Sequence, residues 1–291
     1  MSKTHAKLAI PVAAIGLLSA MPASADDTFF FSTGNPDGKM ATATRPSSPG
    51  KIEIESADDF VLTGSTAIDS ATFTGLLPRG APPSDVSEVR VEIYRVFPLD
   101  SDVGRTSGAP TFSTPQVPTR VNSPSDVELD SRDTASSNLT FQTKDLGSFT
   151  AANSVLPGGI HPTPGQTTGG NGPVTGEEFE FDVTFTTPFS LPADHFFFVP
   201  QVQVTGGNFL WLSAPKTIPA PADLQSWTRD SMLDPDWLRI GTDIVGGNPA
   251  PQFNAAFSLI GVLVPEPATL SLLGAAFAAI GLWGWRRGRP S

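Results

Sequence analysis

Alternation between apolar and polar residues is the sequence feature that most restricts the fold of this chain. Because successive side chains of a β-strand point to opposite faces, a period of two indicates a strand with one buried and one wet face, as antiparallel sheets allow. Two segments, residues 89–94 and 178–185, have apolar residues at every second position: Val89, Val91, Ile93, Phe179, Phe181, Val183 and Phe185. The side chains predicted to lie on the wet faces are Arg90, Glu92, Tyr94, Glu178, Glu180, Asp182 and Thr184.

Further segments of strand composition follow one another along the chain. They are residues 28–31, 52–55, 60–63, 71–76, 139–146, 196–204, 209–212 and 256–264. Gly, Pro, Asn and Asp separate them, in a chain with 29 prolines and 27 glycines. About ten short strands with turn residues between them predict an all-β fold, specifically an antiparallel β-sandwich that is jelly-roll-like.

Three local patterns predict finer detail. Pro200 lacks an N–H, which places the strand at residues 196–204 at a sheet edge or at a bulge. The Gly-Gly-Asn turn at residues 206–208 predicts a hairpin to residues 209–212. A short helix is predicted over residues 222–231, with Asp223 near its start.

Two stretches rich in Gly or Pro, residues 106–125 and 157–173, are predicted to be loops. The second stretch separates either two domains or two parts of one. Because the strands before it are too few to close a sandwich, one domain over residues 26–263 is favoured.

The N-terminal residues 1–25 have the order of a secretory signal peptide. Basic residues come first, an apolar stretch over residues 8–18 follows, and Ala23, Ser24 and Ala25 provide small side chains for a peptidase, with cleavage predicted after Ala25. A membrane anchor or a buried helix is the alternative, which Pro11 and Gly16 disfavour by interrupting the apolar stretch.

The C-terminal residues 264–291 combine three features in a fixed order. A Pro-Glu-Pro motif comes first, then an apolar run over residues 268–285, and then a basic cluster: Pro265, Glu266, Pro267, Arg286, Arg287 and Arg289. As an α-helix the apolar run would span ~27 Å, close to the ~30 Å of a bilayer core. One transmembrane helix with its basic end in the cytoplasm is therefore predicted. A buried core helix would not explain arginines that follow two tryptophans.

This tail resembles the PEP-CTERM sorting signal of exported bacterial proteins. The resemblance implies export through the secretion translocon and a transient inner-membrane anchor. It also implies processing near the motif by an exosortase-type membrane enzyme, and final location at the cell surface or outside the cell. Hosts of this family make extracellular polysaccharide, which the resemblance offers as a partner of the mature protein.

Charge and composition exclude several function classes. The chain has 29 acidic and 18 basic residues, a formal net charge of −11, and several of the basic residues belong to the two ends. Such a surface repels phosphates, so nucleic-acid binding is not expected. No cysteine is present, which excludes disulfides, thiolate nucleophiles and cysteine-containing zinc sites.

No catalytic residue and no cofactor is predicted. The chain has three histidines, of which His5 leaves with the signal peptide, His161 lies in a Gly/Pro loop, and His195 directly precedes an apolar strand. The spacings of a nucleophile elbow, a paired-histidine zinc helix or a dinucleotide-binding loop do not occur.

Carboxylates and tryptophans leave further functions open. Two carboxylates across a cleft would suffice for glycoside hydrolysis, but the acids of residues 178–182 are expected on a solvated face. The pairs Asp100/Asp102 and Asp234/Asp236 resemble partial calcium loops, so whether a metal is bound stays open. Trp211 is expected in the core, whereas Trp227 and Trp237 are expected to be more open, with a structural cap over one end of the sandwich favoured over sugar binding for both.

These observations predict an exported, acidic protein with a structural or binding role linked to extracellular polysaccharide. The alternative is a secreted glycoside hydrolase that uses paired carboxylates. An aromatic platform in the folded domain would favour the first, and a cleft with facing carboxylates would favour the second.

Overall fold

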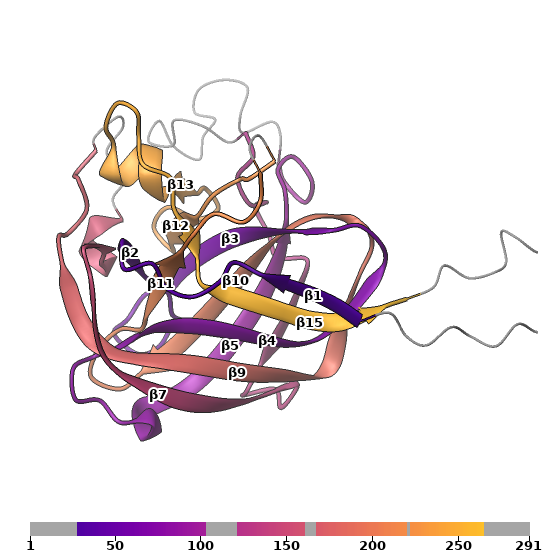
Figure 1. Ribbon diagram of the computed structural model, residues 1–291, viewed down its shortest axis with the longest axis horizontal. Coiled ribbons are helices and arrows are strands. Elements are labelled where there is room, and N and C mark those ends of the chain that lie inside the picture. The colour runs from indigo at the N-terminus through magenta and orange to yellow at the C-terminus, as the bar shows by residue number, and fades with distance from the viewer. Residues whose placement is uncertain (1–27, 103–120, 161–166, 220–221, 265–291) are drawn as a thin grey trace, which may run out of the picture.

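The computed structural model describes residues 28–102, 121–160, 167–219 and 222–264, and these residues form two β-sheets (Figure 1). Strands make up 54% and helices 6% of the structure, which confirms the all-β class and is consistent with a β-sandwich. The predicted signal peptide with Ala25, the Pro-Glu-Pro motif and the predicted transmembrane helix lie outside the described residues. Within the described residues, no helix has the length and apolar character needed to cross a membrane.

The first sheet has nine strands, and its pairs are antiparallel except β2 with β8. Its main path runs β1 (Thr28–Ser32), β15 (Phe257–Leu263), β4 (Thr66–Leu77), β11 (Leu210–Ala214), β2 (Met40–Ala43) and β8 (Asn153–Val155). Three strands lie off this path: β9 (Val174–Leu191) pairs with β4, β7 (Leu139–Ala151) with β9, and β14 (Asn254–Ala255) with β11.

The second sheet has six strands in antiparallel order. They are β13 (Leu238–Arg239), β12 (Trp227–Asp230), β3 (Ile54–Leu62), β10 (Asp194–Val204), β5 (Val86–Arg95) and β6 (Asp130–Asp133). The described residues also include three short helical turns: η1 (Pro83–Asp85), η3 (Pro157–Gly159) and η4 (Ile240–Val245). Both sheets combine strands from before and after the loop at residues 157–173.

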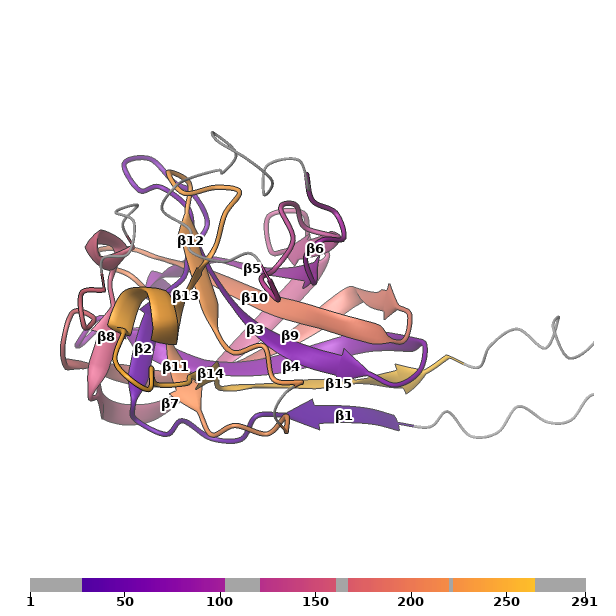
Figure 2. The same cartoon turned by 90° about the horizontal axis from the view of Figure 1, so that it is seen from above.

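Phenylalanines fill the space between the sheets. The apolar face of β9, predicted from its alternation, is buried in one cluster with the inward face of β10. Phe73 and Phe181 stack with ring centroids 5.0 Å apart, as do Phe198 and Phe257. Trp211 belongs to the same cluster, so its predicted core position is confirmed. Figure 2 shows the layers from above, with β5 and β10 over β15 and β1.

The predicted edge position of β10 is wrong. β10 lies between β3 and β5, and its register shift falls between Gln203 and Val204 rather than at Pro200. The backbone pattern explains how the proline is tolerated. Val202 N–H points to the β3 side, toward the carbonyl of Thr44, so alternation places the Pro200 nitrogen on that side too. Pairing with β3 has ended there at Phe198, and no ladder hydrogen bond is lost.

The predicted hairpin at residues 206–208 is also wrong, because β10 belongs to the second sheet and β11 to the first. The turn therefore carries the chain from one sheet to the other. The predicted helix over residues 222–231 does not form either. Its second half is strand β12, which pairs with β3.

The prediction of a wet face on β5 fails in an informative way. Glu92 is 6% exposed and Tyr94 is 1% exposed, although both point away from the core between the sheets. Tyr94 belongs to a separate apolar cluster with Phe197, Trp227 and Trp237, which lies on the outer face of the second sheet. Additional chain covers this face, and buried polar residues gather beneath it.

Candidate functional site

A polar pocket opens on the outer face of the second sheet. It has a volume of about 290 Å³. Most of its charged lining residues are carboxylates, and we call it the acidic pocket. Its lining residues are Glu53, Glu55, Arg90, Glu92, Tyr94, Asp126, Val127, Glu128, Arg229, Ser231, Asp234 and Pro235. Six of these residues are acidic and two are basic, so the pocket favours a ligand without negative charge.

Strand register brings the central residues of the acidic pocket together. Glu55 projects from β3 and stands opposite Arg229 of β12 in the ladder. Glu92 and Tyr94 project from β5 on the same face of the sheet, because residues two apart in a strand share a face. The chain around residues 126–128 and 231–235 forms the other wall.

Tyr94 links the two central carboxylates. Its hydroxyl donates to Glu55 Oε1 at 2.5 Å and lies 3.3 Å from Glu92 Oε2. A phenol has one proton to donate, and the shorter contact with Glu55 uses it. A hydrogen bond between Tyr94 and Glu92 therefore requires a proton on Glu92. Burial, together with the charges of Glu55 and Glu53, raises the pKa of Glu92 well above its ordinary value and favours this protonated form.

Arg229 forms a buried ion pair with Glu55. Its guanidinium contacts both oxygens of Glu55, with Nη2 2.9 Å from Oε1, and Nη2 also donates to the Tyr94 hydroxyl at 3.0 Å. Nη1 donates to the carbonyls of Asp126 and Pro235 at 3.1 Å each. Burial disfavours the charge of Arg229, but Glu55 and Tyr94 outweigh burial and raise its pKa.

The tryptophan predicted to be open packs behind this ion pair. The guanidinium of Arg229 lies 4.3 Å from the ring centre of Trp237, and the Tyr94 ring meets Trp237 edge-on at 5.4 Å. Trp237 Nε1 donates to the carbonyl of Ser125 at 3.0 Å. Trp237 and Trp227 are both 0% exposed, so the expectation that they are more open is wrong. Neither of them offers a platform for a sugar ring.

A second ion pair lies closer to solvent. Arg90 Nη1 is 3.4 Å from Glu53 Oε1, and Arg90 Nη2 is 3.2 Å from Glu88 Oε1. Gln201 Nε2 donates to Glu53 at 3.2 Å. Burial, followed by the charge of Glu55, raises the pKa of Glu53. Hydrogen-bond acceptors on Glu53 and donors on Arg90 therefore meet at the wall of the acidic pocket.

The residues considered from sequence lie elsewhere or have structural partners. Asp100 pairs with Arg95, and Asp234 lies 3.0 Å from Arg229 Nη1. Asp102 donates its backbone N–H to Asp126. Among the residues that the structure describes, no group of three or more acidic or histidine side chains has the arrangement of a metal site.

His195 has a partner that the sequence did not reveal. Its Nε2 lies 2.6 Å from Oδ2 of Asp59, whose Oδ1 accepts the backbone N–H of Leu224. The pair is separate from the acidic pocket, whose lining contains neither residue. His161 lies outside the described residues. The acids of β9, Glu178, Glu180 and Asp182, lie on the outer face of the first sheet, where they are partly or fully exposed.

Sequence reasoning missed Glu55, Glu92, Tyr94 and Arg229 as a group. One signal was available, because Tyr94 is the only tyrosine of the chain and follows Glu92 at strand spacing. The partners Glu55 and Arg229 are 174 residues apart, so only the fold brings them together.

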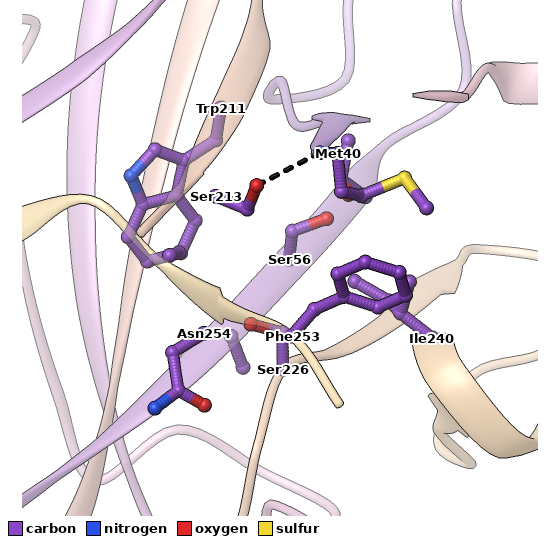
Figure 3. Close-up of a pocket in the computed structure, with 11 residues that line it drawn as sticks. Met40, Ser56, Trp211, Ser213, Ser226, Ile240, Phe253 and Asn254 are labelled. Atoms are coloured by element: carbon purple, nitrogen blue, oxygen red, sulfur yellow. Dashed lines mark hydrogen bonds between the residues drawn. The ribbon is translucent and has the colours of Figure 1, made fainter. Parts of the chain in front are cut away.

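A second cavity lies deeper in the structure and is far smaller. Figure 3 shows its lining, in which the side chains of Trp211, Phe253 and Ile240 surround the hydroxyls of Ser56 and Ser226. The volume of about 10 Å³ is close to the space that one water molecule needs. We therefore do not regard it as a ligand site.

Comparison with known families identifies the tail. The family described as PEP-CTERM protein-sorting motif matches residues 263–289, which include Pro265, Glu266, Pro267 and the three arginines Arg286, Arg287 and Arg289. No curated protein and no solved structure matches this chain. This match confirms that the tail is a PEP-CTERM sorting signal. It supports processing of the protein by exosortase and sorting to the cell surface.

Proposed function

We propose that the β-domain of this exosortase substrate binds a sugar unit of extracellular polysaccharide in the acidic pocket, and that the sugar is neutral or carries an amine. The observation that supports this proposal is the pocket itself, where acceptor carboxylates and donor guanidinium groups converge on a volume of about 290 Å³. This volume is at the small end of the range for ligand pockets and suits one sugar ring.

The chemistry of the lining favours hydroxyl and amine groups. Carboxylates such as Glu53 and Glu128 accept hydrogen bonds from either group, and Arg90 donates to hydroxyl oxygens. Binding by ring stacking is not expected, because Tyr94 and Trp237 are buried. Uronic acids and phosphorylated sugars would place negative charge beside six carboxylates and are expected to bind poorly.

The test compares three oligosaccharides by calorimetry with the exported protein, purified from the cells that make it. Oligomers of glucosamine and of glucose are expected to bind, and oligomers of glucuronic acid are not. Glu53→Gln should weaken glucosamine binding roughly tenfold, because it removes one charge-assisted hydrogen bond. Glu178→Gln, on the outer face of the other sheet, is the matched control and should change nothing. Equal binding of glucuronic acid oligomers would contradict the proposal.

Glycoside hydrolysis is the second candidate, and the Glu55–Tyr94–Glu92 arrangement favours it. Glu55 Oε1 and Glu92 Oε2 both contact the Tyr94 hydroxyl, at 2.5 Å and 3.3 Å, so these two oxygens cannot be farther apart than the sum of the two distances. This limit is compatible with the ~5–5.5 Å between the carboxyl groups of retaining enzymes. In this mechanism the protonated Glu92 is the general acid and the Glu55 carboxylate is the nucleophile. Arg229 and Tyr94 already engage Glu55, which weakens it as a nucleophile and makes this the second choice.

Measurement of new reducing ends in the same oligosaccharides separates the two candidates. Turnover that Glu92→Gln lowers by about a hundredfold or more, and that Glu178→Gln leaves intact, would establish the hydrolase. Binding without turnover supports the binding module.

A further inference from the structure

The N-terminal strand β1 forms an outer edge of the first sheet. Among the described strands it pairs only with β15, from Thr28 opposite Val262 to Ser32 opposite Ser258 (Figure 2). An edge strand carries backbone N–H and C=O groups that can pair with another strand, and proteins usually protect such edges.

The other edges in the described parts of the chain have recognisable protection. The long edge strand β7 carries Lys144 and Asp145 and a register shift between Asp145 and Gly147. β6 has the charged sequence Asp-Ser-Arg-Asp, and β8 and β13 have three and two residues. β1 has the sequence Thr-Phe-Phe-Phe-Ser and no charge, proline or bulge.

Apolar side chains of β1 and of its partner β15 are exposed to solvent. Phe30 is 65% exposed, and Ile260, which stands opposite it on β15, is 40% exposed. Phe29 and Phe31, on the other face, are only partly buried against the core. Apolar side chains that are exposed or only partly buried therefore lie on both faces of this edge.

We propose that β1 pairs with β1 of a second copy of this chain, antiparallel, across a twofold axis through Phe30. The strand is self-complementary about this residue. Phe30 stands opposite Phe30, Phe29 opposite Phe31, and Thr28 opposite Ser32. Each phenylalanine is therefore paired with a phenylalanine of the other copy, and each hydroxyl residue with a hydroxyl residue.

Backbone directions agree with this axis. Thr33 N–H donates to Phe257 on β15, so Phe31 and Phe29 also direct their backbone groups to β15. The N–H and C=O groups of Thr28, Phe30 and Ser32 then face the free edge. In the twofold pair these groups form six hydrogen bonds, with Phe30 at the centre.

Charge does not oppose this arrangement locally. Asp26 and Asp27 precede β1 in the sequence, and the antiparallel pairing puts the two Thr28 residues that follow them at opposite ends of the ribbon. At a strand rise of ~3.3 Å per residue, the two Thr28 residues are ~13 Å apart. This distance exceeds the Debye length of ~8 Å at physiological salt, so repulsion between the aspartates of the two copies is largely screened. Because a five-residue strand buries less than the ~1,200 Å² typical of stable complexes, the dimer is weak and depends on concentration.

The first experiment is sedimentation equilibrium of the exported protein over a concentration series. We expect a monomer–dimer equilibrium that Phe30→Lys weakens by roughly tenfold or more, because like charges then stand opposite each other. Met232→Lys is the matched control, since Met232 is 72% exposed and distant from β1 in sequence, and it should leave the equilibrium unchanged. A monomer at every concentration, or a dimer that Phe30→Lys does not weaken, would overturn the proposal.

The second experiment tests the register and does not depend on the stability of Phe30→Lys. The chain has no cysteine, so introduced cysteines report only on the interface. Thr28→Cys mixed with Ser32→Cys should form disulfide-linked pairs, because hydrogen-bonded residues have Cα atoms ~5.5 Å apart, which a disulfide can bridge. Either variant alone should link much less, since like positions are ~13 Å apart. Equal linking in the mixture and in the single variants would contradict the register.

Discussion

Arg229 is the residue on which the acidic pocket depends most. Its side chain is 5% exposed and that of Glu55 is 7% exposed, so each charge is stable in the interior only because of the other. Removing one partner of a buried pair leaves an uncompensated charge. Arg229→Met should therefore lower the free energy of unfolding by about 3–5 kcal/mol in a urea titration.

Arg90→Met is the comparison for this prediction. Arg90 also contacts glutamates but is 31% exposed, and a pair that solvent screens contributes about 0–1 kcal/mol. Equal losses of stability in the two variants would show that Arg229 has no special structural role in the acidic pocket.

Buried acids at two places should make the protein more stable in mild acid. Burial raises the pKa of Asp58 well above its ordinary value, as it does for Glu92, and Asp59 adds to the effect at Asp58. Between the ordinary pKa of ~4 and the raised value, the folded state holds a proton that the unfolded state has released. Stability from these groups is therefore present at low pH and is lost as the pH rises through the folded-state pKa.

Thermal melting measures this effect. The melting temperature should rise as the pH falls from neutral toward about 5, and Asp58→Asn should reduce the rise. An asparagine keeps the acceptor for the backbone N–H of Ala255 and can donate to Ser226, so it mimics the protonated acid. Asp69→Asn, at a half-buried position on β4, is the control and should leave the rise unchanged. A melting temperature that falls over this range would contradict the assignment.

The site could be predicted from the sequence only in part, for a physical reason. Alternation placed Glu92 and Tyr94 on the same face of a strand, which is correct. It could not show that this face is covered, because the cover comes from residues far away in the chain. Arg229 reaches Glu55 across 174 positions. Local patterns contain no information about such pairs.

At the level of elements, Gly75 shows how closely β4 and its neighbours pack. A Cβ atom at this position would lie 2.2 Å from the ring of Phe209 and 2.6 Å from the carbonyl oxygen of Leu210. The backbone of Leu210 and the buried ring of Phe209 would both have to shift to make room for this atom, which costs free energy of folding. Gly75→Ala should lower the free energy of unfolding by about 1–3 kcal/mol or more.

Gly158→Ala is the matched control, because a Cβ atom at this position would have no heavy atom within 4 Å and the residue has no positive φ. Its stability should stay within about 0.5 kcal/mol of the unchanged protein. Comparable losses in both variants would show that the contact with Phe209 is not the cause.

The positions of strands along the chain were easier to predict than the pairing between strands. Alternation is a local signal, whereas pairing depends on residues that are far apart in sequence. The helix predicted over residues 222–231 illustrates the difference. Asp59 accepts the backbone N–H of Leu224, and Gln225 has a positive φ of 66°, so tertiary contacts override the local helical pattern. The turn at residues 206–208 fits a hairpin locally, but the strands on either side find their partners in different sheets.

At the scale of the whole molecule, the first and last strands place both ends of the domain together. β1 and β15 pair antiparallel, so the chain enters and leaves at the same end of the sheet (Figure 1). In the part of the chain that the structure describes, the final backbone hydrogen bond at this end is from Val264 N–H to the carbonyl of Ser65 at 2.8 Å. The sorting motif begins at the next residue, Pro265. The described part of the domain therefore ends directly before the segment that processing is expected to cut.

This arrangement predicts where the mature protein ends. A cut within β15 would remove residues that pair with β4, whereas a cut after Val264 leaves every described strand and the hydrogen bond from Val264 to Ser65 intact. Mass spectrometry of the protein outside the cell should find a C-terminal residue at or shortly after Val264 and no peptides from residues 270–286. Glu266→Ala should leave membrane insertion intact but block cutting, so that the protein stays in the membrane fraction. The control Glu178→Ala lies on the first sheet and should be processed normally. Peptides from residues 270–286 on the extracellular protein would reject processing and leave a permanent anchor, and a C-terminus within β15 would contradict the role assigned to Val264.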